Sequence, residues 1–374
     1  MKRTLQTILI ATTLLTLLFT SCNADASAGL FRQIADSKAP VGIRYKQIIG
    51  KDGTYLYFIT NDGIYKSTGP VTTSVKANGK LKPVHYAYVD GTTLVYVANS
   101  SAGTEVGQYD LTSGTDTTQS HPTNAGYNEY VIKGVYANKL FLLEGKDTTD
   151  TKQFSLAEYT PNTNTLVDKV TIDASAGLKL HSVLQMSGLQ QKDISATHPM
   201  ILSFVKADKK TYQHFYVQGT NAYELTLDKN RSLVAFTISG GNLYVITEDG
   251  HLYESSTPTG DETLTHKKDL GKSYSPNAFM YAVKDGTTTH LITKTNTETE
   301  GLFVITRDSG GTITTTPISD GYASQMKNVN IVSAFEKPSG DLLIATEKNG
   351  MFDISITDAA TGEGTSKGPE DYTI

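Results

Sequence analysis

The sequence predicts an all-β protein, and three observations lead to that prediction. Threonine, tyrosine, valine and isoleucine, which suit a pleated and half-buried surface, recur along the chain, whereas charged residues make up only 19% of the 374 residues. The 32 glycines provide for many tight turns. In addition, one hairpin pattern recurs: LYFITNDGIYKST at Leu56, LYVITEDGHLYES at Leu243 and, more loosely, LLIATEKNGMFDIS at Leu342. No long stretch has the composition of a helical protein.

Seven apolar strands form a series along the chain, most of them preceded by a turn pair such as Asp90-Gly91 or Gly240-Gly241. They start near Leu56, Leu94, Leu140, Ile201, Leu243, His290 and Leu342, at spacings of 38, 46, 61, 42, 47 and 52 residues. A period of about 40–50 residues with three or four strands per repeat is the signature of a β-propeller. We therefore predict seven blades of four antiparallel strands, and we assign the longest interval to a loop insertion at 188–198.

The fifth repeat can be divided into strands directly. SLVAFTI at 232–238 is the predicted inner strand, NLYVIT at 242–247 and HLYES at 251–255 follow across two glycine turns, and an edge strand lies near 263–267. Such a sheet is apolar on both faces and therefore needs a neighbour on each side. The hairpin recurs because each blade has the same two faces to bury.

The seventh repeat lacks an evident fourth strand, because the segment from Asp358 onward is polar and rich in glycine. We predict that GLFRQI at 29–34 supplies this strand and closes the ring from the N-terminal side. Closure of this kind removes two exposed sheet edges. The predicted propeller therefore spans residues 29–360, and residues 361–374 form a flexible polar tail.

The first residues predict export. Lys2 and Arg3 precede an apolar run from Leu5 to Phe19, which is shorter than the roughly 20 residues of a membrane-spanning helix. The following LFTSC resembles the lipobox of bacterial lipoproteins, although Phe19 stands where that family usually has leucine. The resemblance implies a signal peptide at 1–21, lipid on Cys22 and anchoring of the protein in the bacterial cell envelope, at the outer membrane on its periplasmic or surface face. Residues 22–28 then form a short linker.

Cys22 is the only cysteine, so it cannot form an internal disulfide. The alternative to lipidation is a chance cysteine in or just after an ordinary signal peptide. Removal of residues 1–21 leaves 31 basic and 38 acidic residues, a net charge of −7. An acidic chain without a basic run argues against a nucleic-acid partner and against polybasic attachment to lipid. We expect a monomer.

No local motif predicts a catalytic, cofactor or metal site. The eight histidines show no metal-ligand spacing, and we interpret them as ordinary sheet and loop residues: His85, His121, His181, His198, His214, His251, His266 and His290. The stretch Asp308-Ser309-Gly310-Gly311 superficially resembles a serine-protease loop, but a hairpin turn explains it. We likewise interpret acidic turns such as Asn61-Asp62 and Glu248-Asp249 as turn chemistry rather than calcium sites.

The segments NLYVITEDGHLY and DLLIATEKNGMF resemble propeller repeats of bacterial sensor and surface proteins. The tryptophan-bearing signatures of WD40 and quinone-binding repeats are absent, so no cofactor is inferred from those families. The expected function is a non-enzymatic, lipid-anchored scaffold that binds protein or glycan. Two alternatives stay open: a hydrolase or lyase whose site converges at the central channel, and an accessory lipoprotein of an outer-membrane assembly complex.

Overall fold

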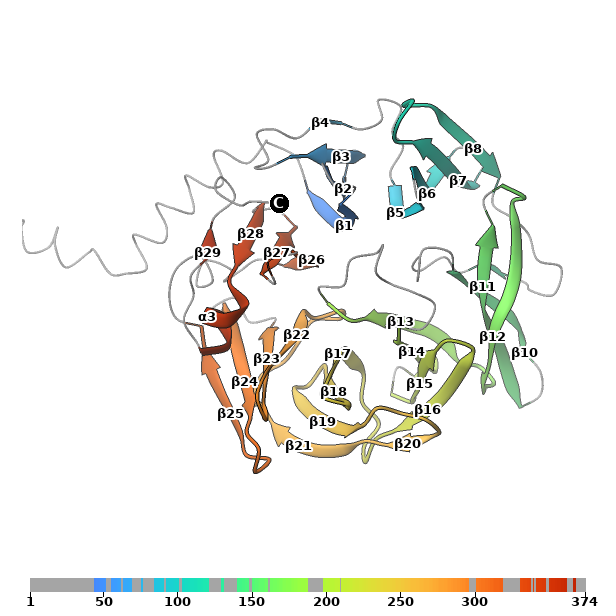
Figure 1. Cartoon of the computed structure of the whole chain (residues 1–374). Coiled ribbons are helices and arrows are strands. Elements are labelled where there is room, and N and C mark those ends of the chain that lie inside the picture. Colours follow the sequence, from blue (N-terminus) through green and yellow to red (C-terminus); the bar gives the residue numbers. More distant parts are fainter. Residues whose placement is uncertain are drawn as a thin grey trace, which may run out of the picture. The chain divides into compact units, whose positions relative to one another are not determined.

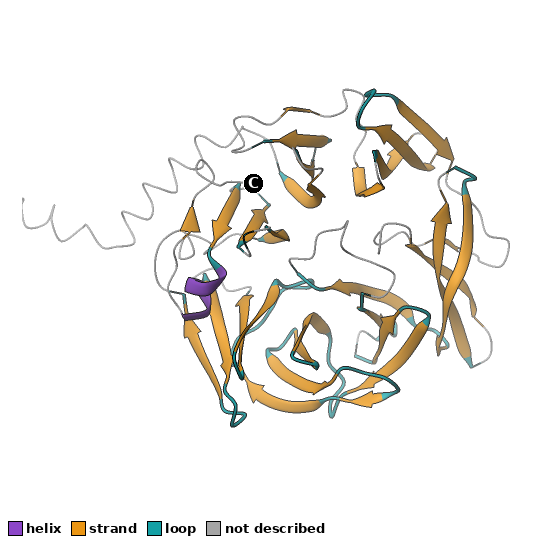
Figure 2. Ribbon diagram, viewed as in Figure 1, coloured by secondary structure: helices purple, strands orange, loops and turns teal. Residues whose placement is uncertain are grey.

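The computed structural model divides the chain into two units, Met1–Gly42 and Ile43–Ile374, and every residue described below lies in the second. Nearly all described elements are strands, which confirms the all-β prediction (Figures 1 and 2). Among these residues no helix is long and apolar enough to cross a membrane. The structure describes residues 44–51, 55–61, 63–68, 75–76, 84–90, 92–100, 103–120, 129–130, 140–147, 150–160, 162–187, 198–208, 210–295, 301–318, 330–337, 339, 341–347, 350–361 and 366–367.

The described strands form seven sheets, numbered here in chain order. Sheet 1 comprises β1 (Tyr45–Lys51), β2 (Leu56–Thr60), β3 (Ile64–Ser67) and β4 (Val75–Lys76). Sheet 2 comprises β5 (Val84–Asp90), β6 (Thr93–Ser100), β7 (Gly103–Asp110) and β8 (Asp116–Ser120). Sheet 3 comprises β9 (Glu129–Tyr130), β10 (Leu140–Asp147), β11 (Thr151–Thr160) and β12 (Thr165–Ser175).

Sheets 4 and 5 carry the site discussed below. Sheet 4 comprises β13 (Lys179–Gln185), β14 (Met200–Val205), β15 (Tyr212–Gln218), β16 (Asn221–Thr226) and β20 (Glu262–Thr263), and sheet 5 comprises β17 (Leu233–Ser239), β18 (Asn242–Thr247), β19 (His251–Ser256) and β21 (Thr265–Asp269). Sheet 6 comprises β22 (Met280–Asp285), β23 (Thr288–Lys294), β24 (Leu302–Arg307) and β25 (Ile313–Pro317). Sheet 7 comprises β26 (Ile331–Glu336), β27 (Leu342–Thr346), β28 (Met351–Ile354) and β29 (Ser366–Lys367).

The core consists of apolar clusters between neighbouring sheets. In the described part of the chain there are seven such clusters, and each joins one sheet to the next: 1–2, 2–3, 3–4, 4–5, 5–6, 6–7 and 7–1. Seven sheets with seven apolar interfaces form a closed ring, which is the β-propeller that the repeat spacing predicts.

Alternation along single strands explains the uninterrupted apolar runs in the sequence. In β27, Leu342 and Ile344 pack toward sheet 6, whereas Leu343 and Ala345 pack toward sheet 1, and all four are buried. Successive side chains of a strand point to opposite faces, so a strand buried on both sides must be apolar at every position. The second strand of each repeat is therefore easy to recognise in the sequence.

The ring closes between sheets 7 and 1, where the Tyr45 amide donates a 3.1 Å hydrogen bond to the Glu347 carbonyl. The fourth strand of sheet 7 is β29, which pairs with β28 after the short helix α3 (Ile356–Thr361). The prediction that the N-terminal side supplies this strand is therefore wrong: Ser366 and Lys367, assigned to the tail, hold that place. The segment 29–34 lies outside the described residues.

Sheet 4 differs from the prediction of four antiparallel strands. Its fifth strand, β20, belongs to the connection between β19 and β21 of sheet 5 and runs parallel to β16. Two hydrogen bonds fix this crossing, from the Leu264 amide to the Thr226 carbonyl and from the Glu224 amide to Asp261 Oδ1. We call the segment at 257–264 the clasp, because it ties sheets 4 and 5 together at their outer strands.

The longest sequence interval has a second cause besides the predicted loop. Strands β11 and β12 are 10 and 11 residues long and pair along ten positions. Their hairpin uses part of the 61-residue spacing, while residues 188–197 of the proposed insertion lie outside the described residues.

The recurring turn joins the second and third strands and repeats its hydrogen bonds as well as its letters. A threonine ends the second strand of each of these sheets, and the amide of the next residue donates a hydrogen bond to the carbonyl of the residue that precedes the first strand. These bonds, of 2.8–2.9 Å, run from Asn61 to Arg44, from Glu248 to Ser232 and from Glu347 to Asn330. These turns and the connections between sheets therefore meet at one end of the blades, which we call the connection face.

Gly250 should be far less tolerant of a side chain than Gly241. Both have left-handed backbones, with φ of +83° and +81°, but a Cβ on Gly250 would lie 1.7 Å from the Lys272 carbonyl oxygen, whereas Gly241 has open space. We expect Gly241→Ala to lower the free energy of unfolding by about 1 kcal/mol. Gly250→Ala should cost at least about 2 kcal/mol more, since backbone must move. Urea unfolding of both variants measures the difference, and equal losses would contradict the packing of the 270–279 connection.

Candidate functional site

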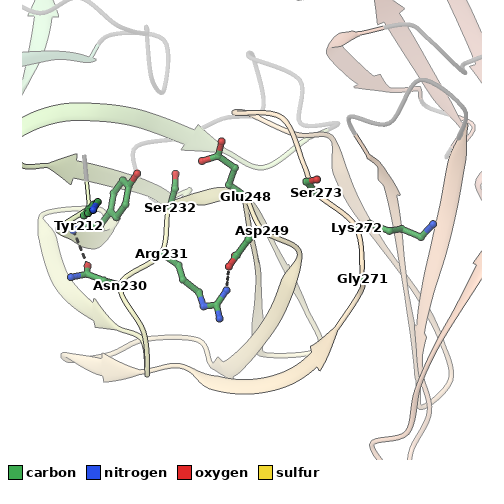
Figure 3. A pocket seen from close by; sticks show the side chains of 10 residues that line it. Tyr212, Asn230, Arg231, Ser232, Glu248, Asp249, Gly271, Lys272 and Ser273 are labelled. Atoms are coloured by element: carbon green, nitrogen blue, oxygen red, sulfur yellow. Dashed lines mark hydrogen bonds and ion pairs between the residues drawn. The ribbon is translucent and has the colours of Figure 1, made fainter. Parts of the chain in front are cut away.

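A cavity of about 940 Å³ opens on the connection face of sheets 4 and 5, beside the connection to sheet 6 (Figure 3). The β14–β15 turn, the connection between β16 and β17, the β18–β19 turn and the connection between β21 and β22 form its walls. It is lined by Lys210, Tyr212, Asn230, Arg231, Ser232, Glu248, Asp249, Gly271, Lys272 and Ser273. Only Glu248 and Asp249 among them belong to the recurring hairpin pattern, because most of the others lie on connections outside the strands.

The first wall, at 227–232, is held by a backbone amide and a side chain of β15. The Tyr212 amide donates a 2.8 Å hydrogen bond to Asn230 Oδ1. His214 is buried, and its Nε2 lies 2.9 Å from the Arg231 carbonyl. A carbonyl oxygen only accepts, so Nε2 carries the proton and Nδ1 accepts from the Ser203 hydroxyl at 2.8 Å. Burial lowers the pKa of His214 to about 4, so this histidine is neutral near pH 7.

The other walls are held by backbone bonds. The Tyr274 amide donates to the Glu248 carbonyl and the Leu270 amide to the Gly250 carbonyl, both at 2.9 Å. In the β14–β15 turn, Asp208 accepts from the amides of Lys210 and Thr211, and these bonds lower the pKa of its carboxyl. The cavity is therefore a preformed feature with fixed main-chain walls.

Charges of both signs line the cavity. Lys210, Arg231 and Lys272 contribute positive charge, and Glu248 and Asp249 contribute negative charge. The Arg231 side chain is only 10% exposed and forms an ion pair with Asp249. Its Nε is buried and has no hydrogen-bond partner. An unsatisfied buried donor costs about 1–3 kcal/mol.

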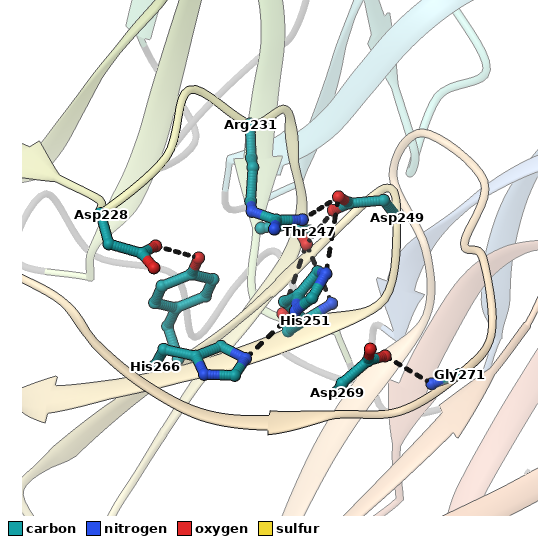
Figure 4. Close-up of polar contacts among 9 residues, drawn as sticks. Asp228, Arg231, Thr247, Asp249, His251, His266, Asp269 and Gly271 are labelled. Carbon is teal, nitrogen blue, oxygen red and sulfur yellow. Dashed lines mark hydrogen bonds and ion pairs between the residues drawn. The ribbon is translucent and has the colours of Figure 1, made fainter.

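Arg231 also belongs to a polar network at the outer side of the cavity (Figure 4). Asp249 accepts a 2.6 Å hydrogen bond from Thr247 Oγ1. The Tyr253 hydroxyl donates to Asp228, and this bond lowers the pKa of the Asp228 carboxyl. Burial, followed by Asp228, raises the pKa of Tyr253 to about 12.

Ser232, which lines the cavity, and His181 form the arrangement that comes nearest to a catalytic pair. Ser232 Oγ lies 3.1 Å from His181 Nε2, and Ser232 is 6% exposed. The two residues come from the start of β17 and the middle of β13, 51 positions apart. A hydroxyl in contact with an imidazole is the starting geometry for general-base activation of a nucleophile.

The structure places the residues singled out in the sequence as follows. Cys22 and His121 lie outside the described residues. Asp308 to Gly311 form the turn between β24 and β25, with the Gly311 amide bonded to the Asp308 carbonyl, as predicted. Three tyrosines of the apolar strand series are buried between blades: Tyr57, Tyr96 and Tyr244.

Of the acidic turns, Asn61, Glu248 and Asp249 belong to the described residues, whereas Asp62 lies outside them. Asn61 Oδ1 accepts from the Arg44 amide, and Asp249 accepts from Thr247. His251 and Glu254 do not act together: His251 contacts His266 across the sheet, whereas the buried Glu254 pairs with Arg307 of sheet 6 at 2.9 Å. The contact between His251 and His266 was not predictable from local spacing, because the two residues are 15 positions apart on strands joined by the clasp.

No family model and no curated protein matches the sequence. Solved structures do match the fold. The tricorn protease superposes with a TM-score of 0.51 at 11% identity, over 87% of this chain and 34% of that chain. KlAtg21, solved in complex with the coiled-coil of AgAtg16, superposes with a TM-score of 0.52 at 12% identity, over 88% of this chain and 99% of that chain. YCF48 from Cyanidioschyzon merolae, a β-propeller protein, superposes with a TM-score of 0.50 at 9% identity, over 84% of this chain and 96% of that chain. These likenesses establish the propeller fold alone.

His214 should make stability depend on pH. The folded-state pKa of about 4 lies below the unfolded value of about 6.5, so the unfolded state binds the proton first. Stability is therefore lost as the pH falls from about 6.5 to 4, by about 3 kcal/mol in all. Between pH 7.5 and 4.5, wild type should lose about 2–3 kcal/mol more than His214→Gln, measured by urea unfolding. His290→Gln serves as the control, and its free energy of unfolding should depend on pH as that of wild type does. If the free energies of unfolding of wild type and His214→Gln fell in parallel with pH, the neutral, buried state of His214 would be refuted.

Proposed function

We propose that this chain is a lipid-anchored β-propeller of the bacterial cell envelope that binds a partner, without catalysis, at the cavity on its connection face. The fold provides the rigid platform, and the lipobox-like sequence ending at Cys22 supports the anchor. Removal of the signal peptide would leave Cys22 as the lipidated first residue.

The observation that carries the proposal is the cavity itself. Its walls come from sheets 4 and 5 and the connection to sheet 6, and backbone hydrogen bonds fix them before any ligand arrives. Preorganised walls lower the ordering cost of binding. The lining carries cations, carboxylates, amide and hydroxyl groups, together with Tyr212 as a rigid aromatic surface. This set favours a hydroxyl- and carboxyl-bearing ligand, such as an acidic glycan or an acidic peptide segment.

The contact between Ser232 and His181 favours the enzymatic alternative, a hydrolase. Ser232 would be the nucleophile and His181 the base. If that alternative holds, the wild-type protein hydrolyses a chromogenic ester and Ser232→Ala does not. The assembly-complex alternative has no comparable support. An assembly surface is expected to show a contiguous exposed apolar patch. Among the described residues, Val167 is the one exposed large hydrophobic side chain.

Lipidation can be tested through Cys22. Wild-type protein expressed in a bacterial host should incorporate labelled palmitate and sediment with membranes. Cys22→Ala should lose the label and move to the soluble fraction, because two or more acyl chains provide a firm anchor at about 0.8 kcal/mol per buried CH₂. Ser27→Ala is the control and should behave like wild type. Membrane attachment of Cys22→Ala without label would refute the anchor.

Ligand binding can be tested at Lys210, an exposed residue of the cavity. Soluble Cys22→Ser protein should bind members of an array of acidic oligosaccharides and acidic peptides. Lys210→Glu should weaken that binding at least about tenfold, which corresponds to about 1.4 kcal/mol. The matched control is Lys284→Glu, since Lys284 is also exposed but lies near the β17–β18 turn at the opposite end of the blades. Equal binding by both variants would place the ligand elsewhere.

A further inference from the structure

His251 and His266 form an unusual pair on the outer half of sheet 5. His251 begins β19, and His266 lies on the neighbouring β21, opposite Tyr253. A register shift between the pairs Leu252–Lys268 and Tyr253–His266 brings the two imidazoles to the same side of the sheet. His251 Nδ1 then lies 3.1 Å from His266 Nε2, with ring centroids 5.1 Å apart (Figure 4).

This separation suits two ligands of one metal ion. Imidazole nitrogens bind zinc at about 2.0–2.1 Å, so two nitrogens at bond angles between about 90° and 110° are separated by roughly 2.9–3.4 Å. In this structure His251 Nδ1 and His266 Nε2 share a hydrogen bond, and their separation of 3.1 Å falls within that interval, so a metal ion could take the place of the shared proton. Imidazole ligands select zinc, copper and nickel over magnesium and calcium, which prefer oxygen.

The surroundings orient both rings. On the remote side of His251, Nε2 lies 3.6 Å from Asp249 Oδ2, a carboxylate already fixed by Thr247. At this distance the carboxylate attracts the ring electrostatically without a hydrogen bond. The His266 ring packs edge-on against Tyr253, with centroids 5.4 Å apart.

The pair is accessible to an ion. His266 is exposed and His251 partly so, so an ion can reach both from solvent. Asp249, which is paired with Arg231, and Asp269 bring carboxylates close to His251, whereas burial and the nearby Arg231 lower the pKa of His251. Asp269 lies opposite His251 in the strand register and is held by the Gly271 amide at 2.8 Å.

We propose that His251 and His266 chelate a divalent late transition-metal ion, Zn²⁺, Ni²⁺ or Cu²⁺, with water completing the coordination shell. No group of three or more His, Cys, Asp or Glu in the described part of the chain is close enough to hold a metal ion, so this is an open two-histidine site rather than a closed structural one. Its water-filled positions can exchange for a carboxylate or imidazole of a bound partner. The site shares Asp249 with the cavity and goes beyond the partner binding proposed above.

Titration calorimetry with NiCl₂ and with ZnCl₂ tests the proposal on untagged Cys22→Ser protein. We expect one equivalent to bind, and His266→Gln and His251→Gln each to weaken binding at least tenfold. His290→Gln is the matched control and should bind like wild type, because His290 lies on β23 of sheet 6, where its Nδ1 lies 3.1 Å from Thr306 Oγ1. No binding, or equal binding by His266→Gln and wild type, would overturn the site.

Cu²⁺ paramagnetic resonance provides a readout that a folding defect cannot imitate. Coupling to two equivalent imidazole nitrogens is expected in wild type, and coupling to one in His266→Gln, whose side chain is exposed and whose thermal unfolding should match wild type. Two coupled nitrogens retained in His266→Gln would show that the copper sits on other histidines and would overturn the assignment.

Discussion

The whole structure depends on one packing constraint: a four-stranded sheet with two apolar faces must have a neighbour on each side. Leu342 and Ile344 face one neighbour while Leu343 and Ala345 face the other, and the same division recurs in β2 and β18. A row of such sheets always leaves two faces exposed unless it closes on itself. The contact between Tyr45 and Glu347 is where this chain closes.

Closure also explains why the cavity has a defined shape. Each connection on the connection face begins and ends at strands that the ring has already placed, so hydrogen bonds such as Glu248 amide to Ser232 carbonyl can form without further ordering. The clasp between sheets 4 and 5 adds a second tie at the outer strands. The blades that carry Arg231, Asp249 and His251 are thus among the most firmly joined, as a rigid support for a binding site requires.

The parts of the fold that repeat could be predicted from the sequence, and the parts that do not repeat could not. Burial on both faces leaves an apolar run, and the TNDG and TEDG turns follow it, so the strands of the fifth repeat were placed within one or two residues. The clasp left no such trace, since Glu262 and Thr263 are too short a strand to show alternation.

The closing strand β29 was missed for the same reason, as Ser366 and Lys367 are polar and flanked by glycine. The pairing of His251 with His266 was beyond prediction because it depends on a register shift in the sheet. Cavity residues such as Asn230 and Lys272 lie on irregular connections, where sequence carries turn preferences but no periodicity.

Native-state hydrogen exchange tests ring closure most directly. The account predicts that amides of β1 (Tyr45–Lys51) and β26 (Ile331–Glu336), on either side of the closure, open with the same free energy as those of β18 (Asn242–Thr247), because all belong to one cooperative ring. Separate, earlier exchange of β1 and β26 while β18 stays protected would show that the ring is open at this point and would contradict the account.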